Sequence, residues 1–453
     1  MRPNTRFTWS GGYAIAYQVV GDGVRDLVYL PGWVSNVDVS WDVPPIARFL
    51  EGLSSFSRLI LLDRRGVGCS DRYSPHASPP LEEMADDVLA VMDAVGSRSA
   101  TLFGVQDTAF IAMMLAASAP KRVTSLVLFG AAAAWTRNEE MPWQASAAEW
   151  EEIIADSTDV ESAFENADDY TRRNLPSLAG DPTLVQRLAS LILTSQSPGA
   201  WKAELVRFSQ VDVRDILPTI QAPTLVLHRT GDPIEAIESG RHLAGKILGA
   251  RFVELEGVDT QPWAGNTDAV LAEVEAFVGG AARPTTEEPQ REERVLATVL
   301  FTDIVGSTQR AAEIGDRAWR ELLGRHHETV RELLEHFHGV EVDTAGDGFL
   351  ARFDGPARGV RCAQAIVQAV RPLGIQIRAG LHTGEVELVG DKVEGIAVHT
   401  GARVAAKAGP SEVLVSQTVK DLVAGSGLVF EDAGEHELKG VPYRWRLYRV
   451  VSS

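Results

Sequence analysis

The chain has 453 residues, of which 45% are hydrophobic and 23% charged, and its formal net charge is −19. This length predicts two or three globular domains, and the strong acidity argues against a nucleic-acid binder, which needs a basic face. The two cysteines, Cys69 and Cys362, exclude a disulfide framework and favour a reducing compartment. No apolar run reaches the about 20 residues of a membrane span, and the first residues are too polar for a signal peptide. We therefore expect a cytoplasmic protein.

Residues 1–278 alternate apolar runs with helical patterns, which predicts a mostly parallel sheet with helices on both faces. Between about residues 135 and 215 the strand pattern stops and tryptophan-containing helical segments follow, which predicts an inserted cap. Residues 279–294 predict a linker, because they combine glycine, proline and charge with no apolar residue larger than alanine. The predicted strands of this first domain are 27–30, 59–62, 100–103, 123–129, 224–228 and 251–255.

Residues 295–453 predict a smaller α+β domain with a βαββαβ order. The two strands around Asp347 are expected to form a hairpin. The other predicted elements are strand 295–301, helix 307–336, helix 356–370, strand 375–381, helix 395–407 and strand 412–416.

Five stretches of the first domain form an ordered set of motifs. They are Leu30–Trp33, Asp63–Asp71, Leu102–Thr108, Pro223–Asp232 and Leu255–Trp263. On these stretches the domain resembles the α/β-hydrolase family along its whole length, and they match the oxyanion loop, the turn after the next strand, the nucleophile elbow, the acid strand and the histidine loop. The resemblance implies an α/β-hydrolase fold, with a mostly parallel sheet and a helical cap.

The same resemblance places the serine, acid and histidine of a hydrolase triad at Gln106, Asp232 and Thr260. An amide is neither a nucleophile nor a base, and Asp232 then has no histidine to orient. Asp107 would need a one-residue shift to act as nucleophile, and the histidine would still be missing. We therefore expect no hydrolase activity.

Eight of the ten tryptophans lie in the first domain. Aromatic side chains around a concave site suit a small apolar ligand, although large aromatics are also ordinary core residues. The domain is therefore predicted to be either a ligand sensor or a scaffold. The tryptophans expected near the pocket or the cap are Trp33, Trp41, Trp135, Trp143, Trp150, Trp201 and Trp263.

Two acids of the second domain, Asp303 and Asp347, lie in segments suited to a metal-bound triphosphate. Asp303 ends an apolar strand that leads into a glycine turn and a helix, and Asp347 lies between two glycines. Carboxylates on rigid turns suit Mg²⁺ or Mn²⁺. The helix that opens near Ser307 offers free N–H groups to a phosphate.

Five motifs follow one another along the second domain. They are Phe301–Thr308, Ala345–Phe349, Arg378–Gly384, His399–Arg403 and Glu437–Gly440. On these motifs the domain resembles the class III adenylate/guanylate cyclase catalytic domain, an α+β, ferredoxin-like fold. The resemblance implies that ATP or GTP is converted to the 3′,5′-cyclic nucleotide and pyrophosphate, with two Mg²⁺ or Mn²⁺ ions per active site. In this family one subunit supplies the metal ligands and its partner the cationic residues, which implies a homodimer through the cyclase domains.

The family roles carry over to individual positions. Asp303 and Asp347, with the carbonyl of Ile304, would be the metal ligands. Arg403 would neutralise charge that develops at the α-phosphate, and Lys439 would bind the terminal phosphates. The turn residues expected at the phosphates are Gly306, Ser307 and Thr308.

Three positions depart from the family pattern. His399 replaces the usual asparagine that orients the ribose or transition state, and its titration would make activity depend on pH between about 6 and 7. Family adenylate cyclases read adenine with a lysine and an aspartate, whereas here Asp343 stands at the lysine position and Lys392 at the aspartate position. This inverted pair suits the guanine edge. Alternatively, the two side chains pair with each other and the base is held by shape, and the commoner bacterial activity keeps ATP slightly ahead.

The sequence therefore predicts a homodimeric nucleotidyl cyclase with a degenerate hydrolase-fold module that regulates or scaffolds it. One alternative is a receptor or scaffold whose cyclase domain is weak or inactive. The other is an esterase or lipase.

Overall fold

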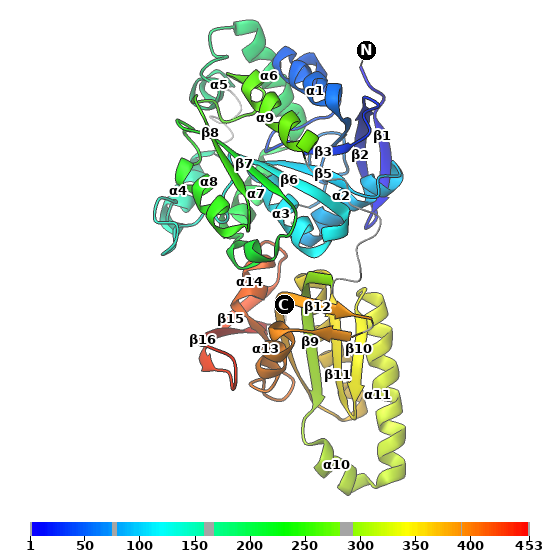
Figure 1. The fold of residues 1–453 in the computed structure, drawn as a ribbon. Helices are drawn as coiled ribbons and strands as arrows, with labels where there is room; N and C mark the ends of the chain where they lie inside the picture. The colour runs from blue at the N-terminus through cyan, green and yellow to red at the C-terminus, as the bar shows by residue number, and fades with distance from the viewer. Residues whose placement is uncertain (1, 75–78, 158–166, 281–292, 391, 452–453) are drawn as a thin grey trace. The chain divides into compact units, whose positions relative to one another are not determined.

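The computed structural model describes residues 2–74, 79–157, 167–280, 293–390 and 392–451 (Figure 1). The chain folds into two compact units, Met1–Glu287 and Glu288–Ser453. Most of the predicted linker, at residues 281–292, lies outside the described residues. Among the described helices, each is too short or too polar to cross a lipid bilayer.

The first unit is built on an eight-stranded sheet with the order β1-β2-β4-β3-β5-β6-β7-β8. Strands β3 to β8 are parallel, and the hairpin β1–β2 joins antiparallel through β2. Continuous apolar runs form the parallel strands because both faces of the sheet are covered. The six predicted strands are present, whereas β1 and β2 were not predicted. The bounds are β1 Arg6–Ser10, β2 Tyr13–Val20, β3 Asp26–Leu30, β4 Arg58–Leu62, β5 Ala100–Val105, β6 Val123–Phe129, β7 Thr224–Arg229 and β8 Arg251–Leu255.

Helices cover both faces of this sheet (Figure 1). Helix α1 contacts α9 on one face, and α2 contacts α3 on the other. The described part of the predicted cap is helical, and proline and a capping side chain start two of its helices: Asp181 accepts from two N–H groups of α6, and Ser197 from one of α7. The bounds are α1 Pro44–Phe56, α2 Leu81–Ala94, α3 Thr108–Ser118, α4 Ala147–Ser157, α5 Ala167–Asn174, α6 Pro182–Ser195, α7 Pro198–Gln210, α8 Ile237–Lys246 and α9 Thr267–Gly280, with 3₁₀ turns η1 Val39–Asp42, η2 Pro120–Arg122 and η3 Arg214–Thr219.

The second unit has a mixed sheet with the order β10-β11-β9-β12-β14-β16-β15, and β13 pairs with β12. Only the pairing of β12 with β14 is parallel within the described sheet. Strand β12 is longer than predicted, and β13, β15 and β16 were not predicted. The bounds are β9 Glu293–Ile304, β10 Val340–Ala345, β11 Gly348–Phe353, β12 Ile377–Val389, β13 Lys392–Glu394, β14 Val413–Ser416, β15 Val429–Glu437 and β16 Arg444–Val451.

The second sheet has a hydrophobic cluster on each face. Phe349, Phe353 and residues of α11 and α12 form one cluster, and Leu350 and residues of α13 belong to another. The prediction of one helix over residues 307–336 is wrong, because Gly315 adopts φ +82° and separates α10 from α11. The bounds are α10 Ser307–Ile314, α11 Asp316–His336, α12 Pro356–Ala369, α13 Ile396–Ala405 and α14 Gln417–Leu422, with a 3₁₀ turn η4 Arg371–Leu373.

Candidate functional site

The two predicted metal ligands of the second unit lie on adjacent turns. Asp303 lies near the end of β9, and Asp347 occupies the turn between β10 and β11, which pairs with β9. The Ile304 N–H donates to Asp347 Oδ2 at 3.1 Å, which ties the second acid to the first segment. A Cβ atom at Gly348 would lie 3.1 Å from the Thr302 carbonyl oxygen and 4.0 Å from Asp303 Oδ1. Glycine at 348 therefore lets the two acid-bearing segments approach closely.

Arg378, to which the sequence assigned no role, binds one of these acids. It lies on β12 directly opposite Asp303 in the antiparallel register. Its Nε donates to Asp303 Oδ2 at 3.0 Å, and its Nη2 contacts the same oxygen. Both contacts fall on Oδ2. The signal that could have revealed this pair was the position of Arg378 at the start of a family motif, but the register that places it there comes from the fold.

The oxygen atoms on the turns that carry Asp303 and Asp347 fit a hard divalent cation. Asp303 and Asp347 offer carboxylate oxygens, which Mg²⁺ and Mn²⁺ prefer, and the Ile304 carbonyl belongs to the same segment. Within the described ranges, no group of three or more His, Cys, Asp or Glu side chains forms a candidate metal cluster. Two carboxylates suit a site where substrate phosphates supply further oxygen ligands.

The predicted phosphate-binding turn begins α10. Gly306 adopts the left-handed conformation, φ +67°, and is the N-cap residue, with no side-chain hydrogen bond to the first turn. Ser307 and Thr308 are the first two residues of the helix. The turn therefore presents backbone N–H groups of the kind that bind phosphate.

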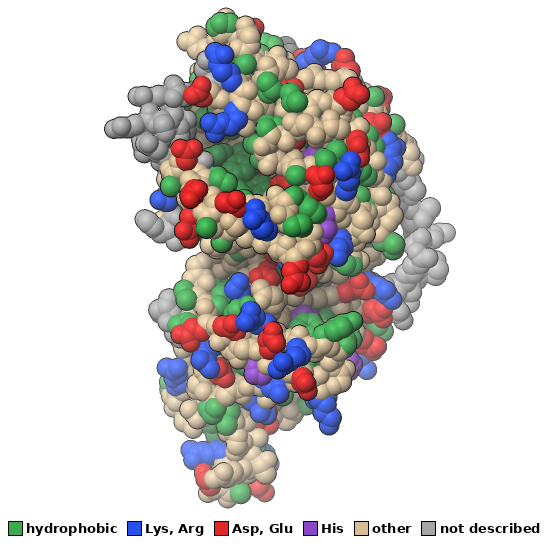
Figure 2. All heavy atoms as spheres, turned by 90° about the vertical axis from the view of Figure 1, so that its left-hand side faces the viewer, with side chains coloured by type: hydrophobic (Ala, Val, Ile, Leu, Met, Phe, Trp, Pro, Cys, Tyr) green, Lys and Arg blue, Asp and Glu red, His purple; other side chains and the backbone are tan. Residues whose placement is uncertain are grey.

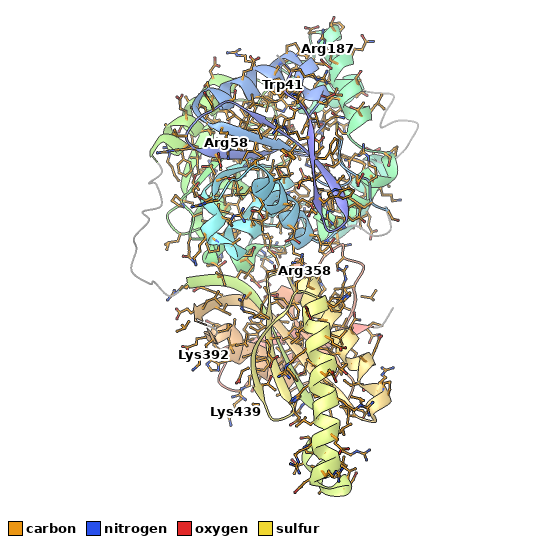
Figure 3. All side chains as sticks on the ribbon, turned by 90° about the vertical axis from the view of Figure 1, so that its right-hand side faces the viewer. Trp41, Arg58, Arg187, Arg358, Lys392 and Lys439 are labelled. Atoms are coloured by element: carbon orange, nitrogen blue, oxygen red, sulfur yellow. The ribbon has the colours of Figure 1, made fainter. Side chains whose placement is uncertain are left out.

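The predicted cationic residues gather on one surface of the second unit. Arg403 on α13 donates from Nε to the carbonyl oxygen of Lys439 at 3.0 Å. His399 lies one helical turn before Arg403, so both side chains project from the same face of α13. Figure 3 draws Lys439 at the margin of this unit. The structure therefore places Arg403 against the backbone of Lys439 and on the same helix face as His399.

The two predicted base-recognition residues lie near each other but do not pair. Asp343 on β10 accepts a hydrogen bond from the Thr344 N–H at 2.9 Å, and Lys392 begins β13. β10 contacts β13, and their neighbours Val342 and Val393 pack in the same hydrophobic cluster. No ion pair joins Asp343 to Lys392 in the described part of the chain, so the alternative in which they neutralise each other is not observed. The Lys392 side chain is exposed (Figure 3).

In the first unit, the elbow keeps its backbone geometry without a nucleophile. Gln106 lies between β5 and α3 with φ +50°, a conformation that non-glycine residues rarely adopt. Its side chain is buried, and its Oε1 accepts from Gln261 Nε2 at 2.8 Å. A Cβ atom at Gly130 would lie 3.4 Å from Asp232 Oδ2 and 3.7 Å from Gln106 Cγ, so Gln106 and Asp232 border the same small space. Thr260 is fully buried, and its hydroxyl has no partner among the described residues.

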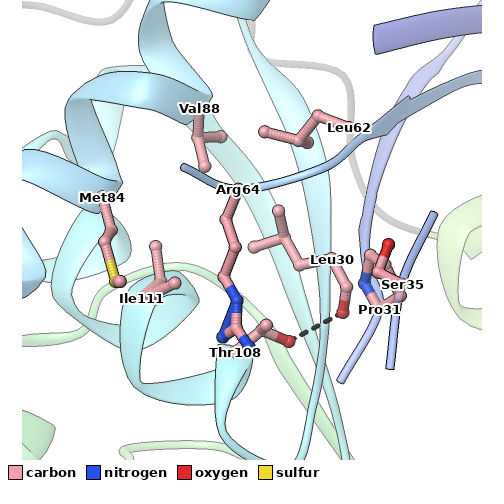
Figure 4. A pocket seen from close by; sticks show the side chains of 9 residues that line it. All are labelled: Leu30, Pro31, Ser35, Leu62, Arg64, Met84, Val88, Thr108 and Ile111. Atoms are coloured by element: carbon pink, nitrogen blue, oxygen red, sulfur yellow. Dashed lines mark hydrogen bonds between the residues drawn. The ribbon is translucent and has the colours of Figure 1, made fainter. Parts of the chain in front are cut away.

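Asp107 is held in a buried ion-pair network. Arg64 binds Asp107 Oδ2 at 2.5 Å and Glu204 Oε2 at 2.6 Å. Burial raises the pKa of Asp107 to about 7, against the opposing effect of Arg64. Arg64 also lines a void of about 10 Å³, beside which Thr108 Oγ1 donates to the Leu30 carbonyl at 2.7 Å (Figure 4). The structure thus places Asp107 in a structural network that ties the elbow to α7.

A cavity of about 940 Å³ lies in the first unit and is lined by Gln106, Asp232 and residues of the cap. In Figure 2 this unit shows a hollow with hydrophobic side chains at its floor and charged side chains at its rim. Five of the predicted tryptophans line the cavity, Trp33, Trp135, Trp143, Trp150 and Trp201.

Two predicted pocket tryptophans do not line the cavity. Trp263 is buried in the core that contains α1 and α9. Trp41 packs against the same core and donates from Nε1 to Gln18 Oε1 at 2.8 Å (Figure 3). The pattern of aromatic residues alone did not distinguish core from cavity.

Asp232 is the one residue of the predicted triad that has kept an ionisable side chain. Its Oδ1 accepts from the N–H groups of Ile234 and Glu235 at 2.9 and 3.1 Å. Burial raises its pKa to about 6. With glutamine and threonine at the other two positions, the arrangement offers no nucleophile–base pair.

Comparison with known families finds a different match for each of the two units. Residues 27–259 match the family described as alpha/beta hydrolase fold, and residues 288–451 match the adenylate and guanylate cyclase catalytic domain. The chain belongs to the α/β-hydrolase fold family, and its second unit is a class III adenylate/guanylate cyclase catalytic domain.

Three similar proteins each match part of this chain. "Putative adenylate cyclase 3" of Rhizobium meliloti is 30% identical over 158 residues, which cover 33% of this chain and 27% of that protein. The chain therefore spans about a quarter of the length of this relative. The pimeloyl-[acyl-carrier protein] methyl ester esterase of Neisseria meningitidis is 25% identical over 261 residues, 57% of this chain and 78% of that protein. The crystal structure of a hydrolase from Pseudomonas aeruginosa covers 61% of this chain and 99% of its own, with 27% identity and a TM-score of 0.51.

Proposed function

We propose that the second unit is a nucleotidyl cyclase that converts ATP or GTP to the 3′,5′-cyclic nucleotide and pyrophosphate. The observation that carries this proposal is the approach of Asp303 and Asp347 on adjacent turns, fixed by the hydrogen bond from Ile304 N–H to Asp347. The grouping of His399, Arg403 and Lys439 on one surface supports it.

The residues of the two acid-bearing segments and of the neighbouring strand have distinct roles in this proposal. When bound at Asp303 and Asp347, Mg²⁺ or Mn²⁺ would lower the pKa of the ribose 3′-hydroxyl and neutralise phosphate charge. Arg378 holds Asp303 Oδ2 and orients that carboxylate, leaving Oδ1 toward the neighbouring turn. The N–H groups at Gly306–Thr308 bind phosphate oxygens.

The cationic surface acts on the developing charge. The Arg403 guanidinium stabilises negative charge at the α-phosphate, and Lys439 binds the leaving pyrophosphate. His399 donates a hydrogen bond to the ribose. In a homodimer through the cyclase units, the acids of one copy and the cationic surface of the other form each active site.

We also propose that the first unit is a ligand-sensing module without hydrolase activity. Gln106 and Thr260 cannot act as nucleophile and base. The tryptophan-lined cavity beside Gln106 supports binding of a small ligand.

The proposal is tested by measuring cyclic nucleotide and pyrophosphate from ATP and from GTP separately, with purified full-length protein and Mn²⁺. We expect product from at least one nucleotide and its loss in the Asp303→Ala variant. Equal product in wild type and Asp303→Ala would reject the assigned site.

A further inference from the structure

Six polar atoms around the tryptophan-lined cavity have no hydrogen-bond partner among the described residues. Four are N–H donors and two are acceptors. Buried polar groups in folded proteins are nearly always paired, so such a concentration at one cavity indicates a ligand that supplies the partners. The donors are Trp33 Nε1, Gln106 Nε2, Trp135 Nε1 and Gln196 Nε2, and the acceptors are Gln196 Oε1 and Asp232 Oδ2.

Both glutamines among these residues are almost completely enclosed. Gln106 is 2% exposed and Gln196 is 6% exposed, and both line the cavity. Gln261 Nε2 already binds Gln106 Oε1, so Nε2 is the atom of the Gln106 amide that has no partner among the described residues. The cavity therefore carries a built polar site beside its hydrophobic floor.

Four indole rings form a continuous aromatic wall of this cavity. The Trp33 ring lies 4.7 Å from Trp201 and 5.1 Å from Trp135, with an interplanar angle of 16° to Trp135. The Trp135 ring lies 6.0 Å from Trp150 at 18°. Trp150 is fixed because its Nε1 donates to the Trp135 carbonyl at 2.7 Å. Trp135 is stacked between Trp33 and Trp150, and an extended aromatic wall of this kind favours a ligand with rings of its own.

The charges around the cavity argue against an anionic ligand. Acidic side chains outnumber basic ones among the lining residues, and Arg137 is paired with Glu149. A carboxylate or phosphate would meet this excess of negative charge. The acidic lining residues that carry this charge are Glu149, Glu152, Asp156, Asp169 and Asp232, and the basic ones are Arg137 and Arg173. Glu235 also lines the cavity, but burial raises its pKa to about 8 and keeps it mostly neutral.

The unpartnered donors argue against a cationic ligand. An ammonium group would satisfy Asp232 Oδ2, but it has no lone pair for the N–H groups of Trp33, Trp135 and Gln106. Neutral oxygen atoms accept from such donors, and a hydroxyl group can also donate to a carboxylate.

We propose that this cavity binds an uncharged, ring-bearing ligand that carries at least one carbonyl oxygen and one hydroxyl group. Its oxygens accept from Trp33, Trp135 and Gln106, its hydroxyl donates to Asp232, and its rings pack on the tryptophan wall. This inference rests on the ligand-sensing role proposed for the first unit and names the ligand class.

The test measures the binding of four probes of similar shape to the full-length protein without nucleotide. Binding is measured by calorimetry and by tryptophan fluorescence. The probes are para-hydroxybenzophenone, the anion para-benzoylbenzoate, the cation para-(aminomethyl)benzophenone and the hydrocarbon diphenylmethane. We expect the hydroxyketone to bind at least about tenfold more tightly than each of the other three. Equal or tighter binding of a charged probe or of the hydrocarbon would overturn the proposal, as would the absence of saturable binding by all four.

Matched tryptophan variants locate the binding. Trp33→Phe keeps a ring in the wall but removes the N–H donor, so we expect it to weaken hydroxyketone binding about fivefold. Trp9→Phe is the control, because Trp9 on β1 is 72% exposed and does not line the cavity. Equal affinities of the two variants would contradict the assigned contact. Asp303→Ala should bind the probe as the wild type does, so a failure of the cyclase proposal and a failure of this one are seen separately.

Discussion

The nucleophile elbow of the first unit and the turns that carry Asp303 and Asp347 in the second unit (the acid turns) differ in their chemical groups. The elbow retains its backbone conformation alone, whereas the acid turns retain the side chains suited to their site. At the elbow, Gln106 keeps φ +50° and its buried position between β5 and α3, yet no nucleophile or base is present among the predicted triad positions. At the acid turns, Asp303 and Asp347 are chemically suited to their site and are joined through the Ile304 N–H. The backbone of a site and its reacting groups are therefore specified by different residues, and one can be present without the other.

The strained backbone of Gln106 at the elbow calls for an explanation other than catalysis, because Gln106 is not a nucleophile. A non-glycine residue in the left-handed region costs about 1–3 kcal/mol and persists where the surrounding fold enforces it. Here the enforced position belongs to Gln106, which lines the tryptophan-lined cavity and has an unpartnered amide nitrogen among the described residues. We infer that the first unit uses its elbow for binding, whereas the second uses its turns for catalysis.

The largest expected effect comes from the second acid of the cyclase unit. Asp347→Ala should lower the rate of cyclic nucleotide formation by at least about 100-fold, because it removes a ligand of the charge-neutralising metal. The control is Asp354→Ala, an exposed acid paired with Arg358 at the start of α12. Similar rates for the two variants would show that the acid turns are not the catalytic site. Rates are measured by separation of the cyclic product.

Two substitutions should restore chemistry to the elbow if only the reacting groups are missing. Gln106→Ser with Thr260→His would supply nucleophile and base next to Asp232, and we expect ester hydrolysis at least about tenfold above the wild type. Gln106→Ser alone should stay at the wild-type level, because its hydroxyl has no base. The assay is release of para-nitrophenol from a short-chain ester. A correctly folded double variant without activity would show that the elbow geometry has also been lost.

Exchange of the base-recognition residues tests whether the inverted pair reads the nucleotide. Asp343→Lys combined with Lys392→Asp should shift the ratio of ATP to GTP turnover toward ATP by about tenfold. Neither side chain is buried, so the exchange should not affect folding. The ratio is measured from kcat/KM for each nucleotide. An unchanged ratio would mean that the base is held by shape.

Mixing two inactive variants tests whether the site is shared between subunits. Asp303→Ala and Arg403→Ala should each be inactive alone. After subunit exchange, a mixed dimer contains one intact site, so an equal mixture should recover about a quarter of wild-type activity. Recovery is measured against the mixing ratio. No recovery, after mass spectrometry has shown mixed dimers, would place all catalytic residues of a site in one copy.

The smallest expected effect is a difference in how the folding stability of the two units depends on pH. In the first unit, burial raises the pKa of Asp107 to about 7 and of Glu235 to about 8, so the folded unit binds more protons than the unfolded chain. Its stability should rise as the pH falls from about 8.5 to 6.5. In the second unit, burial lowers the pKa of His326 and His382 to about 4, so its stability should fall as the pH drops from about 6.5 to 5.

Scanning calorimetry at several pH values would measure these opposite responses. We expect the midpoint temperature of unfolding of the first unit to rise by roughly 3 °C as the pH falls from about 8.5 to 6.5. Glu235→Gln should reduce that rise, because it keeps the hydrogen bond from Gln144 and removes the titrating group. Parallel shifts of both transitions would contradict the assignment.

The sequence predicted elements with strong local patterns and missed those that depend on tertiary contacts. The central parallel strands of the first unit, β3 to β7, are mostly apolar and buried, whereas the β1–β2 hairpin is partly exposed and turns at Gly11 and Gly12. The break at Gly315 requires a positive φ that helical periodicity does not report. The pairing of Arg378 with Asp303 follows from strand register, and a single sequence does not provide that register.

The candidate sites show the same limit. Motifs brought Asp303, Asp347 and Arg403 to attention, but only the fold shows that the first two lie on adjacent turns. Composition suggested a tryptophan-lined pocket, yet Trp41 and Trp263 belong to the core. The unpartnered donors of the cavity are visible only after every other hydrogen bond is placed.

The most direct test of the contrast between the two units measures both activities in one preparation. Purified wild type and Asp303→Ala are each incubated with Mn²⁺ and ATP or GTP, and in parallel with a para-nitrophenyl ester. The account predicts cyclic nucleotide from the wild type, none from Asp303→Ala, and no ester hydrolysis above buffer by either protein. Ester hydrolysis without cyclic nucleotide formation would contradict it, because the reacting groups would then lie in the first unit and not in the second.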